Sequence, residues 1–95
     1  RKSSSTFGKW AGEKISEKNK KQIWVPKGFA HGFLVLSEIA EVIYKTTDYY
    51  TPQFERCILW NDPKLSIDWN LNEEYLLLSN KDKKGELIQN VQVFD

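Results

Sequence analysis

Residues 22–36, QIWVPKGFAHGFLVL, decide the fold class of this 95-residue chain. Residues 22–25 and 29–36 are rich in β-branched and aromatic side chains, which favour strands. Between them, Pro26 has no N–H to donate to a strand ladder, and Pro26-Lys27-Gly28 is typical of a turn. The stretch therefore predicts two strands joined by a tight turn.

Short apolar segments and turn signals alternate on both sides of this stretch. Upstream, residues 8–15 predict a strand and residues 16–20 a charged turn, and downstream Ser37-Glu38 predicts a turn before a strand over residues 39–46. Further expected segments are residues 55–60 as a strand, 67–69 as a short extended piece, 72–78 as either a helical turn or an extended segment, and 91–94 as a terminal strand. This regular spacing predicts an all-β sandwich or barrel. Because five or six strands are few for a closed barrel, the open edges need cover from another segment or a second subunit.

Composition excludes several classes of protein. Fourteen Lys and Arg nearly cancel thirteen Asp and Glu, so there is no electrostatic case for a nucleic-acid or acidic-membrane partner. Cys57 is the single cysteine and cannot form an internal disulfide, which fits a reducing cytosol. No apolar run approaches the roughly 20 residues of a membrane span, and there is no signal-peptide pattern. Since the chain begins at Arg1 without methionine, we expect its natural N-terminus to be missing.

Few side chains suggest chemistry by pattern alone. His31 follows the Pro26–Gly28 turn, where a side chain can enter a barrel mouth, although a structural histidine is an equal alternative. A metal site is not expected, because zinc and iron need three or four converging ligands and no second histidine exists. Tyr44 fits an ordinary strand aromatic as well as a proton donor, whereas Tyr49-Tyr50 in a loop favours stacking on a nucleobase. Glu55 and Lys81 fit ordinary surface positions, whereas Asp82 fits either the orientation of a base or a solvated KDKK turn.

Residues 22–69, QIWVPKGFAHGFLVLSEIAEVIYKTTDYYTPQFERCILWNDPKLSIDW, closely resemble the dTDP-4-dehydrorhamnose 3,5-epimerase family. PKGFAH matches the PxGxxH element typical of cupins, and the HGF, SE-AE-YK, T-YY and ILWND elements follow in the family's order. STFGKW at residues 5–10 and LSNKD at residues 78–82 extend the resemblance to roughly residues 4–82. Residues 84–95 match no pattern and are expected to form a C-terminal tail.

The resemblance implies the C-terminal part of a single cupin-type jelly-roll barrel over residues 1–95, from a cytoplasmic homodimer with no metal and no organic cofactor. The implied substrate is a dTDP-sugar, dTDP-4-dehydro-6-deoxy-D-glucose, epimerised at C3 and C5 on the way to dTDP-L-rhamnose. The implied roles are proton donation for Tyr44, a place in the substrate pocket for His31, stacking on thymine for Tyr50, nucleotide-sugar binding for Glu55 and Lys81, and pairing with the catalytic histidine for Asp82.

One departure from the family pattern is large. The family's base is a histidine in an R-G-x-H-x-Q element, followed by an enolate-stabilising lysine, and neither is among residues 1–95. His31 lies in the context of the family's other histidine and is not expected to be the base. Residues 1–95 alone are therefore expected to be inactive. Two alternatives stay open: an epimerase acting at only C3 or only C5, and a non-catalytic cupin-like module that binds a nucleotide sugar.

Overall fold

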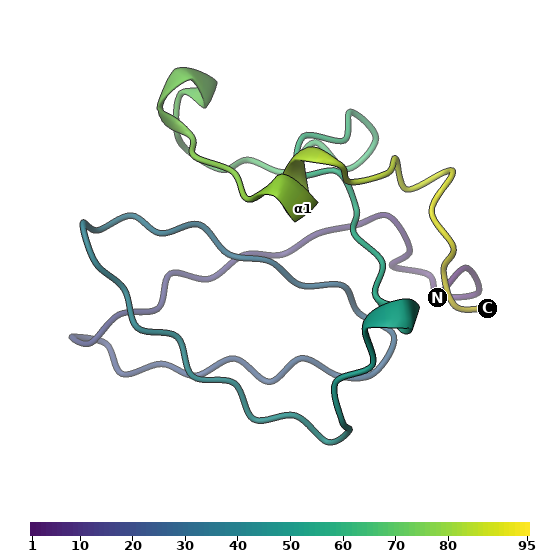
Figure 1. Ribbon diagram of the computed structural model, residues 1–95, viewed down its shortest axis with the longest axis horizontal. Coiled ribbons are helices and arrows are strands. Elements are labelled where there is room, and N and C mark those ends of the chain that lie inside the picture. The colour runs from purple at the N-terminus through teal and green to yellow at the C-terminus, as the bar shows by residue number, and fades with distance from the viewer.

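A computed structural model describes all residues 1–95, and most of its backbone is extended (Figure 1). The regular elements are three single turns: the 3₁₀ helices η1 (Pro52–Phe54) and η2 (Glu73–Tyr75), and the helix α1 (Asn80–Lys83). The alternatives left open for residues 72–78 are both present in part, since η2 precedes an extended stretch at 76–78. None of the helices has the length and apolar character needed to cross a membrane.

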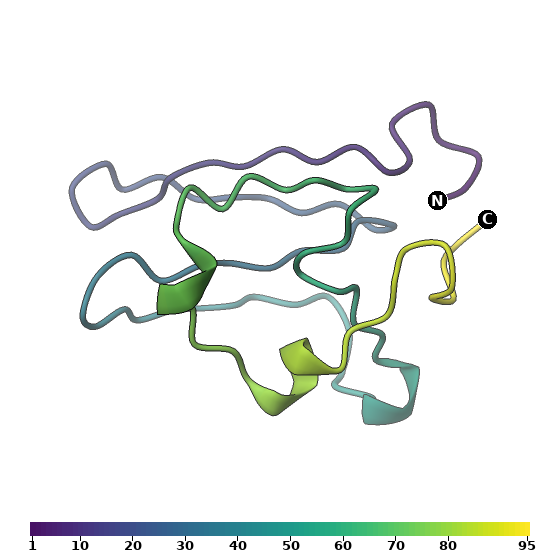
Figure 2. The ribbon, with the colours of Figure 1, turned by 90° about the horizontal axis from the view of Figure 1, so that it is seen from above.

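The first half of the chain reverses direction about every ten residues. Turns or bends lie at residues 17–19, 27–28, 37–38 and 47–48, and long extended segments run between them (Figures 1 and 2). Gly28 adopts φ +87°, a left-handed conformation that glycine reaches without a Cβ penalty. The turns predicted at residues 16–20, 26–28 and 37–38 are confirmed, because Gly, Pro and Ser set these reversals locally.

The predicted strands are extended but form no sheet among themselves. None of the 19 backbone–backbone hydrogen bonds joins two of the segments that run between residues 9 and 46. One β-bridge exists in the whole chain, a parallel contact between Ile58 and Glu86. A ladder needs a neighbouring strand about 4.8 Å away, and no successive segment supplies it. The fold is therefore an extended chain with tight reversals, and the closed barrel stays a prediction.

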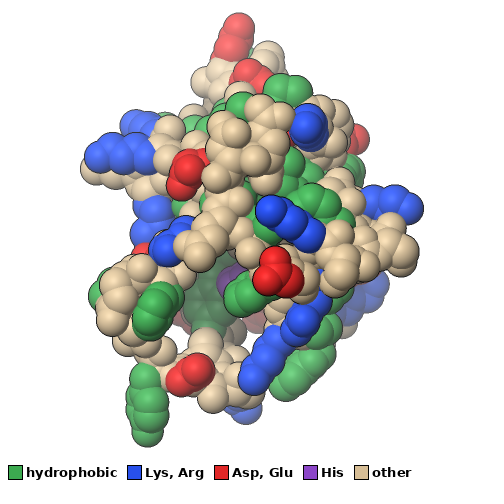
Figure 3. Space-filling model, turned by 90° about the vertical axis from the view of Figure 1, so that its right-hand side faces the viewer, with side chains coloured by type: hydrophobic (Ala, Val, Ile, Leu, Met, Phe, Trp, Pro, Cys, Tyr) green, Lys and Arg blue, Asp and Glu red, His purple; other side chains and the backbone are tan.

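Apolar side chains of these segments lie open to solvent. Trp24 is 80 %, Ile39 81 % and Ile43 88 % exposed, and Val91 is the one fully buried apolar residue. Figure 3 shows such side chains on one face, lying between charged groups. Burial of apolar surface is the dominant favourable term in folding, and these segments leave much of their apolar surface unburied.

Each long-range backbone hydrogen bond of the chain has one partner in the C-terminal third. Leu59 N–H donates to the Glu86 carbonyl at 2.8 Å, and Glu86 N–H donates to the Cys57 carbonyl at 2.9 Å. Lys2 N–H donates to the Phe94 carbonyl at 2.8 Å, which holds the two ends of the chain together (Figure 1). Residues 84–95, expected to be a tail without assignable pattern, thus dock on the 57–62 segment.

Gly85 lies so close to the backbone of Leu59 that a larger residue would not fit without a shift. A Cβ at this position would lie 2.7 Å from Leu59 Cα and 2.8 Å from Leu59 N, both rigid backbone atoms. Gly85→Ala in the full-length protein is expected to lower the free energy of unfolding by about 1–3 kcal/mol, the usual range for an overpacked site. Urea denaturation measures this loss. Gly32→Ala is the matched control, because nothing lies within 4 Å of its added Cβ, and equal losses in both variants would contradict the assignment.

Candidate functional site

His31 and Tyr44 come together on two extended segments. Their ring centroids are 6.0 Å apart and their planes are inclined by 58°, so the two rings lie within range of an aromatic contact. His31 lies on the extended segment that follows the turn at residues 27–28. Tyr44 lies on the next extended segment, which follows the bend at residues 37–38. Tyr44 is 56 % exposed. A phenol and an imidazole that are close together and partly open to solvent can both face one small ligand.

Glu55 and Lys81 also come together, although 26 positions separate them in the sequence. Lys81 Nζ donates to Glu55 Oε2 at 2.7 Å, joining α1 to the residue that caps η1. This hydrogen bond and then the Glu55 charge raise the pKa of Lys81, and the nearby Tyr50 contributes in the same direction. The lysine is therefore a cation at neutral pH. Exposed ion pairs add little to stability, so this pair is better placed to bind than to hold the fold.

Asp82 is held by its own helix. Ser79 caps α1, since its hydroxyl accepts from Asp82 N–H at 3.1 Å, and the same hydroxyl donates to Asp82 Oδ2 at 2.7 Å. The other carboxylate oxygen, Oδ1, lies 3.8 Å from Cys57 Sγ. Burial first, and the Asp82 charge second, raise the pKa of the Cys57 thiol. Asp82 is thus oriented toward Cys57 and does not pair with His31.

Tyr50 is placed by the loop that precedes η1. Its ring is 75 % exposed and packs on no other aromatic ring of the chain. The neighbouring Tyr49 is 94 % exposed. An exposed flat ring beside the Lys81 cation has both the surface and the position for stacking on a base.

Three residues around this cluster were not predicted as site residues from the sequence. Arg56 donates to Gln92 Oε1 at 2.8 Å and ties the C-terminal residues to the segment that carries Glu55. Cys57 faces Asp82, and Asp62 is the most buried polar side chain, 2 % exposed. The Asn61-Asp62-Pro63 turn signal was visible in the sequence, because aspartate commonly accepts the N–H two residues onward. The long-range partners of these residues had no local signal.

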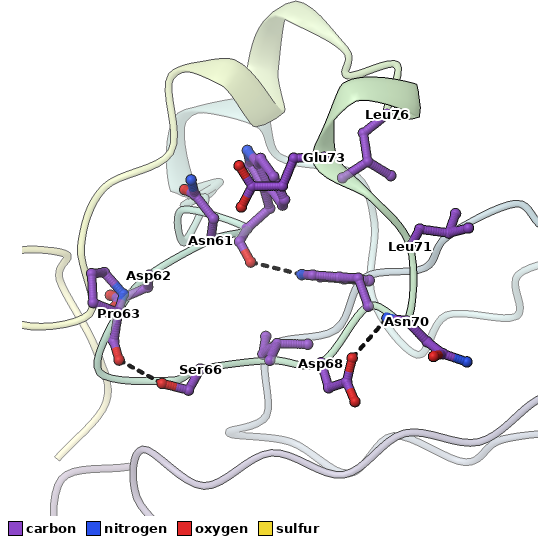
Figure 4. A pocket seen from close by; sticks show the side chains of 12 residues that line it. Asn61, Asp62, Pro63, Ser66, Asp68, Asn70, Leu71, Glu73 and Leu76 are labelled. Carbon is purple, nitrogen blue, oxygen red and sulfur yellow. Dashed lines mark hydrogen bonds between the residues drawn. The ribbon is translucent and has the colours of Figure 1, made fainter.

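A cavity of about 240 Å³ is lined by residues between Trp60 and Leu76 (Figure 4). Trp69 Nε1 donates to the Trp60 carbonyl at 2.8 Å across it, and Asp68 Oδ1 accepts from Asn70 N–H. None of the residues predicted to bind substrate lines this cavity. No group of three or more His, Cys, Asp or Glu side chains is placed to hold a metal ion anywhere in the chain.

Comparison with known proteins gives one consistent result. The sequence model of the family described as dTDP-4-dehydrorhamnose 3,5-epimerase matches residues 1–90. A protein of that name from Pseudomonas aeruginosa is 55% identical over 94 residues, which cover 99% of this chain and 51% of the relative. The Escherichia coli protein is 55% identical over 84 residues, covering 88% of this chain and 45% of the relative. The Methanothermobacter thermautotrophicus protein is 40% identical over 95 residues, covering 99% and 51%.

The chain spans about half the length of the curated relatives it matches. The match nevertheless runs over nearly the whole chain, and it includes both side-chain pairs described above. The resemblance found in the sequence is therefore confirmed, and this chain belongs to the dTDP-4-dehydrorhamnose 3,5-epimerase family.

Proposed function

We propose that the full-length protein epimerises C3 and C5 of dTDP-4-dehydro-6-deoxy-D-glucose, giving dTDP-4-dehydro-L-rhamnose. The relatives at 49–55% identity carry the name of this activity. The single observation that carries the proposal is the pairing of His31 with Tyr44 and of Glu55 with Lys81. Each pair joins two residues expected from the sequence to contact the same substrate.

The chemistry asks for a base, an acid and a means of stabilising negative charge. The C4 ketone acidifies the hydrogens at C3 and C5, so a base removes each as a proton and an enolate forms. An acid on the opposite face of the sugar then returns a proton with inverted configuration. Tyr44 is the proposed acid, and the base is a histidine outside residues 1–95. Asp82 is proposed to pair with that histidine and to fix its tautomer.

Glu55, Lys81 and Tyr50 are proposed to bind the nucleotide part of the substrate. Lys81 is held as a cation by Glu55, which suits it to the diphosphate, and the exposed ring of Tyr50 suits the thymine. His31 is proposed to contact the sugar beside Tyr44. The proposed assembly is a cytoplasmic homodimer of cupin-type jelly-roll barrels that uses no metal and no organic cofactor.

The test is the incorporation of solvent deuterium. Full-length protein and dTDP-4-dehydro-6-deoxy-D-glucose in deuterated water are expected to give a product labelled at both C3 and C5, which NMR resolves. Label at one position would identify a 3- or 5-epimerase. Absence of label, together with intact dTDP binding, would overturn the enzymatic proposal and identify a nucleotide-sugar-binding module.

Tyr50 is expected to contribute binding energy rather than chemistry. Base–aromatic stacking is worth roughly 1–3 kcal/mol, so Tyr50→Ala in the full-length protein is expected to weaken dTDP binding by about ten- to a hundredfold. Tyr50→Phe keeps the ring face and is expected to bind almost normally. Calorimetric titration measures both variants, and equal losses would rule out stacking.

A further inference from the structure

Asp62 is buried and both of its carboxylate oxygens accept hydrogen bonds, yet the proposed reaction assigns it no role. The residue as a whole is 2 % exposed. Oδ2 accepts from Ile88 N–H at 2.6 Å, and Oδ1 accepts from Lys64 N–H at 2.7 Å. Hydrogen bonds to an ionised carboxylate are among the stronger ones in proteins. The Ile88 N–H is the first of the groups that lower the pKa of Asp62, so the carboxylate is ionised at neutral pH.

The bond to Ile88 is the last of three contacts that fix residues 85–88 on the segment 57–62. The other two are the backbone pair of Glu86 with Cys57 and Leu59, and the seat of Gly85 against the Leu59 backbone. We use the name carboxylate clasp for the Asp62 side chain with its two backbone donors, Ile88 and Lys64. Because the clasp joins positions 26 residues apart, it restrains the chain far more than a local turn does.

Backbone hydrogen bonds at the end of α1 connect the clasp to Lys81, one of the residues proposed to bind the nucleotide. α1 ends at Lys83, and Gly85 N–H donates to the Asp82 carbonyl while Lys84 N–H donates to the Lys81 carbonyl. The residues that leave α1, Lys84 and Gly85, are therefore followed three positions later by Ile88, which Asp62 holds. On the other side, Glu55 and Cys57 immediately precede the bridge at Ile58. Lys81 and Glu55 thus each lie a few residues from the place where residues 85–88 contact residues 57–62.

A helix of four residues cannot hold its own position, because isolated short helices are marginal in water. α1 has no buried residue, so packing does not hold it either. What remains is the Ser79 cap, the attachment at residues 85–88, and the exposed contacts that Lys81 and Asp82 make with Glu55 and Cys57. The contacts at residues 85–88 are the ones among these that involve buried or backbone groups, because the Lys81–Glu55 ion pair is exposed and exposed pairs add little to stability.

We infer that Asp62 is a positioning residue: its carboxylate clasp holds α1 so that Lys81 reaches Glu55 and Asp82 stays against Cys57. The inference rests on the proposed function for its kinetic consequences, and on the geometry alone for its structural ones. Misplacement by about 1 Å can cost about a hundredfold in rate. Loss of the clasp is accordingly expected to act on both the KM of the nucleotide sugar and kcat.

The first measurement does not depend on catalysis. Cys57 lies against Asp82, and both burial and that carboxylate raise the pKa of its thiol. In full-length Asp62→Ala, α1 is expected to leave Cys57, so its alkylation by iodoacetamide, followed by peptide mass spectrometry, becomes severalfold faster. Trp69→Phe is the matched control, since it removes the 2.8 Å bond to the Trp60 carbonyl from the same segment without touching residues 85–88. The control is expected to keep the parental alkylation rate.

The second measurement is kinetic and uses dTDP-4-dehydro-6-deoxy-D-glucose well below the melting temperature of every variant. Asp62→Ala is expected to lower kcat/KM by about ten- to a hundredfold. Asp62→Asn is expected to lie between it and the parent, because the amide oxygen still accepts one backbone N–H. Trp69→Phe is expected to keep kcat and KM. Glu55→Gln is expected to cost less in the Asp62→Ala background than alone, because the pair is already parted.

Two results would overturn the inference. One is a folded Asp62→Ala protein with the parental alkylation rate at Cys57. The other is faster alkylation and lower kcat/KM in Trp69→Phe to the same degree as in Asp62→Ala, which would indicate general loosening. If the parental protein does not turn over the sugar at all, the proposed function fails, and the alkylation comparison still decides the role of Asp62.

Discussion

Tyr44→Phe in the full-length protein is expected to lower turnover by about 10²–10⁴-fold, the usual contribution of one positioned acid or base. The substitution keeps the ring beside His31, 6.0 Å away, and removes only the hydroxyl. Nucleotide binding is expected to survive, because Glu55, Lys81 and Tyr50 belong to a different cluster. Exchange of the C3 and C5 hydrogens with solvent is expected to outlast epimerisation, since a separate base forms the enolate.

Initial rates of epimerisation, dTDP calorimetry and deuterium incorporation together measure this effect. Tyr49→Phe is the matched control, because it deletes a phenol hydroxyl from a side chain that is 94 % exposed and has no assigned role. Full epimerisation by Tyr44→Phe would show that another group returns the proton. A loss of dTDP binding that matches the loss of turnover would instead place the hydroxyl in nucleotide recognition.

Residues 1–95 alone are expected to show no turnover and to be poorly folded as a monomer. His31 is the one histidine, and its context is not that of the family's base, so no group here is expected to abstract the proton. Two residues are fully buried, Val91 and Asp62, while a domain's total stability is only about 5–15 kcal/mol. The exposed apolar surface and the unpaired backbone groups are expected to lower the stability by more than this amount.

An epimerase assay on the purified 95-residue chain, with size-exclusion chromatography alongside, measures both parts of that expectation. The elution volume is expected to correspond to an expanded or self-associated species. Turnover by a well-behaved monomer would require a different base, and it would remove the argument that residues from elsewhere complete the core.

The sequence predicted the reversals better than the pairing between segments. Gly28 and the Pro before it determine their turn through local backbone sterics, so the reversal at residues 27–28 was readable. Strand pairing depends on which segments become neighbours, and period-two patterns carry no such information. The choice at residues 72–78 was open because Asn72 is a good N-cap for η2 while Leu76-Leu77-Leu78 equally suits extended backbone.

The same division holds for the site. His31, Tyr44, Glu55 and Lys81 were predicted from motifs, and the structure brings them together in pairs. Their individual roles stay predictions. The seat of Gly85 and the carboxylate of Asp62 escaped prediction because their importance arises from contacts 26 residues away. Nothing in a short polar stretch such as NDPK distinguishes a surface turn from one that anchors another segment.

The absence of ladder bonds between successive extended segments has a consequence for the speed of folding. If neighbours in sequence do not pair, each segment must find a partner distant along the chain, and the mean sequence separation of contacts is high. Folding rates fall steeply with that separation, because loop entropy is lost before any contact forms. The ten-residue spacing of the reversals therefore orders the direction of the chain early, while the strand pairing of the predicted barrel is expected to form late and slowly.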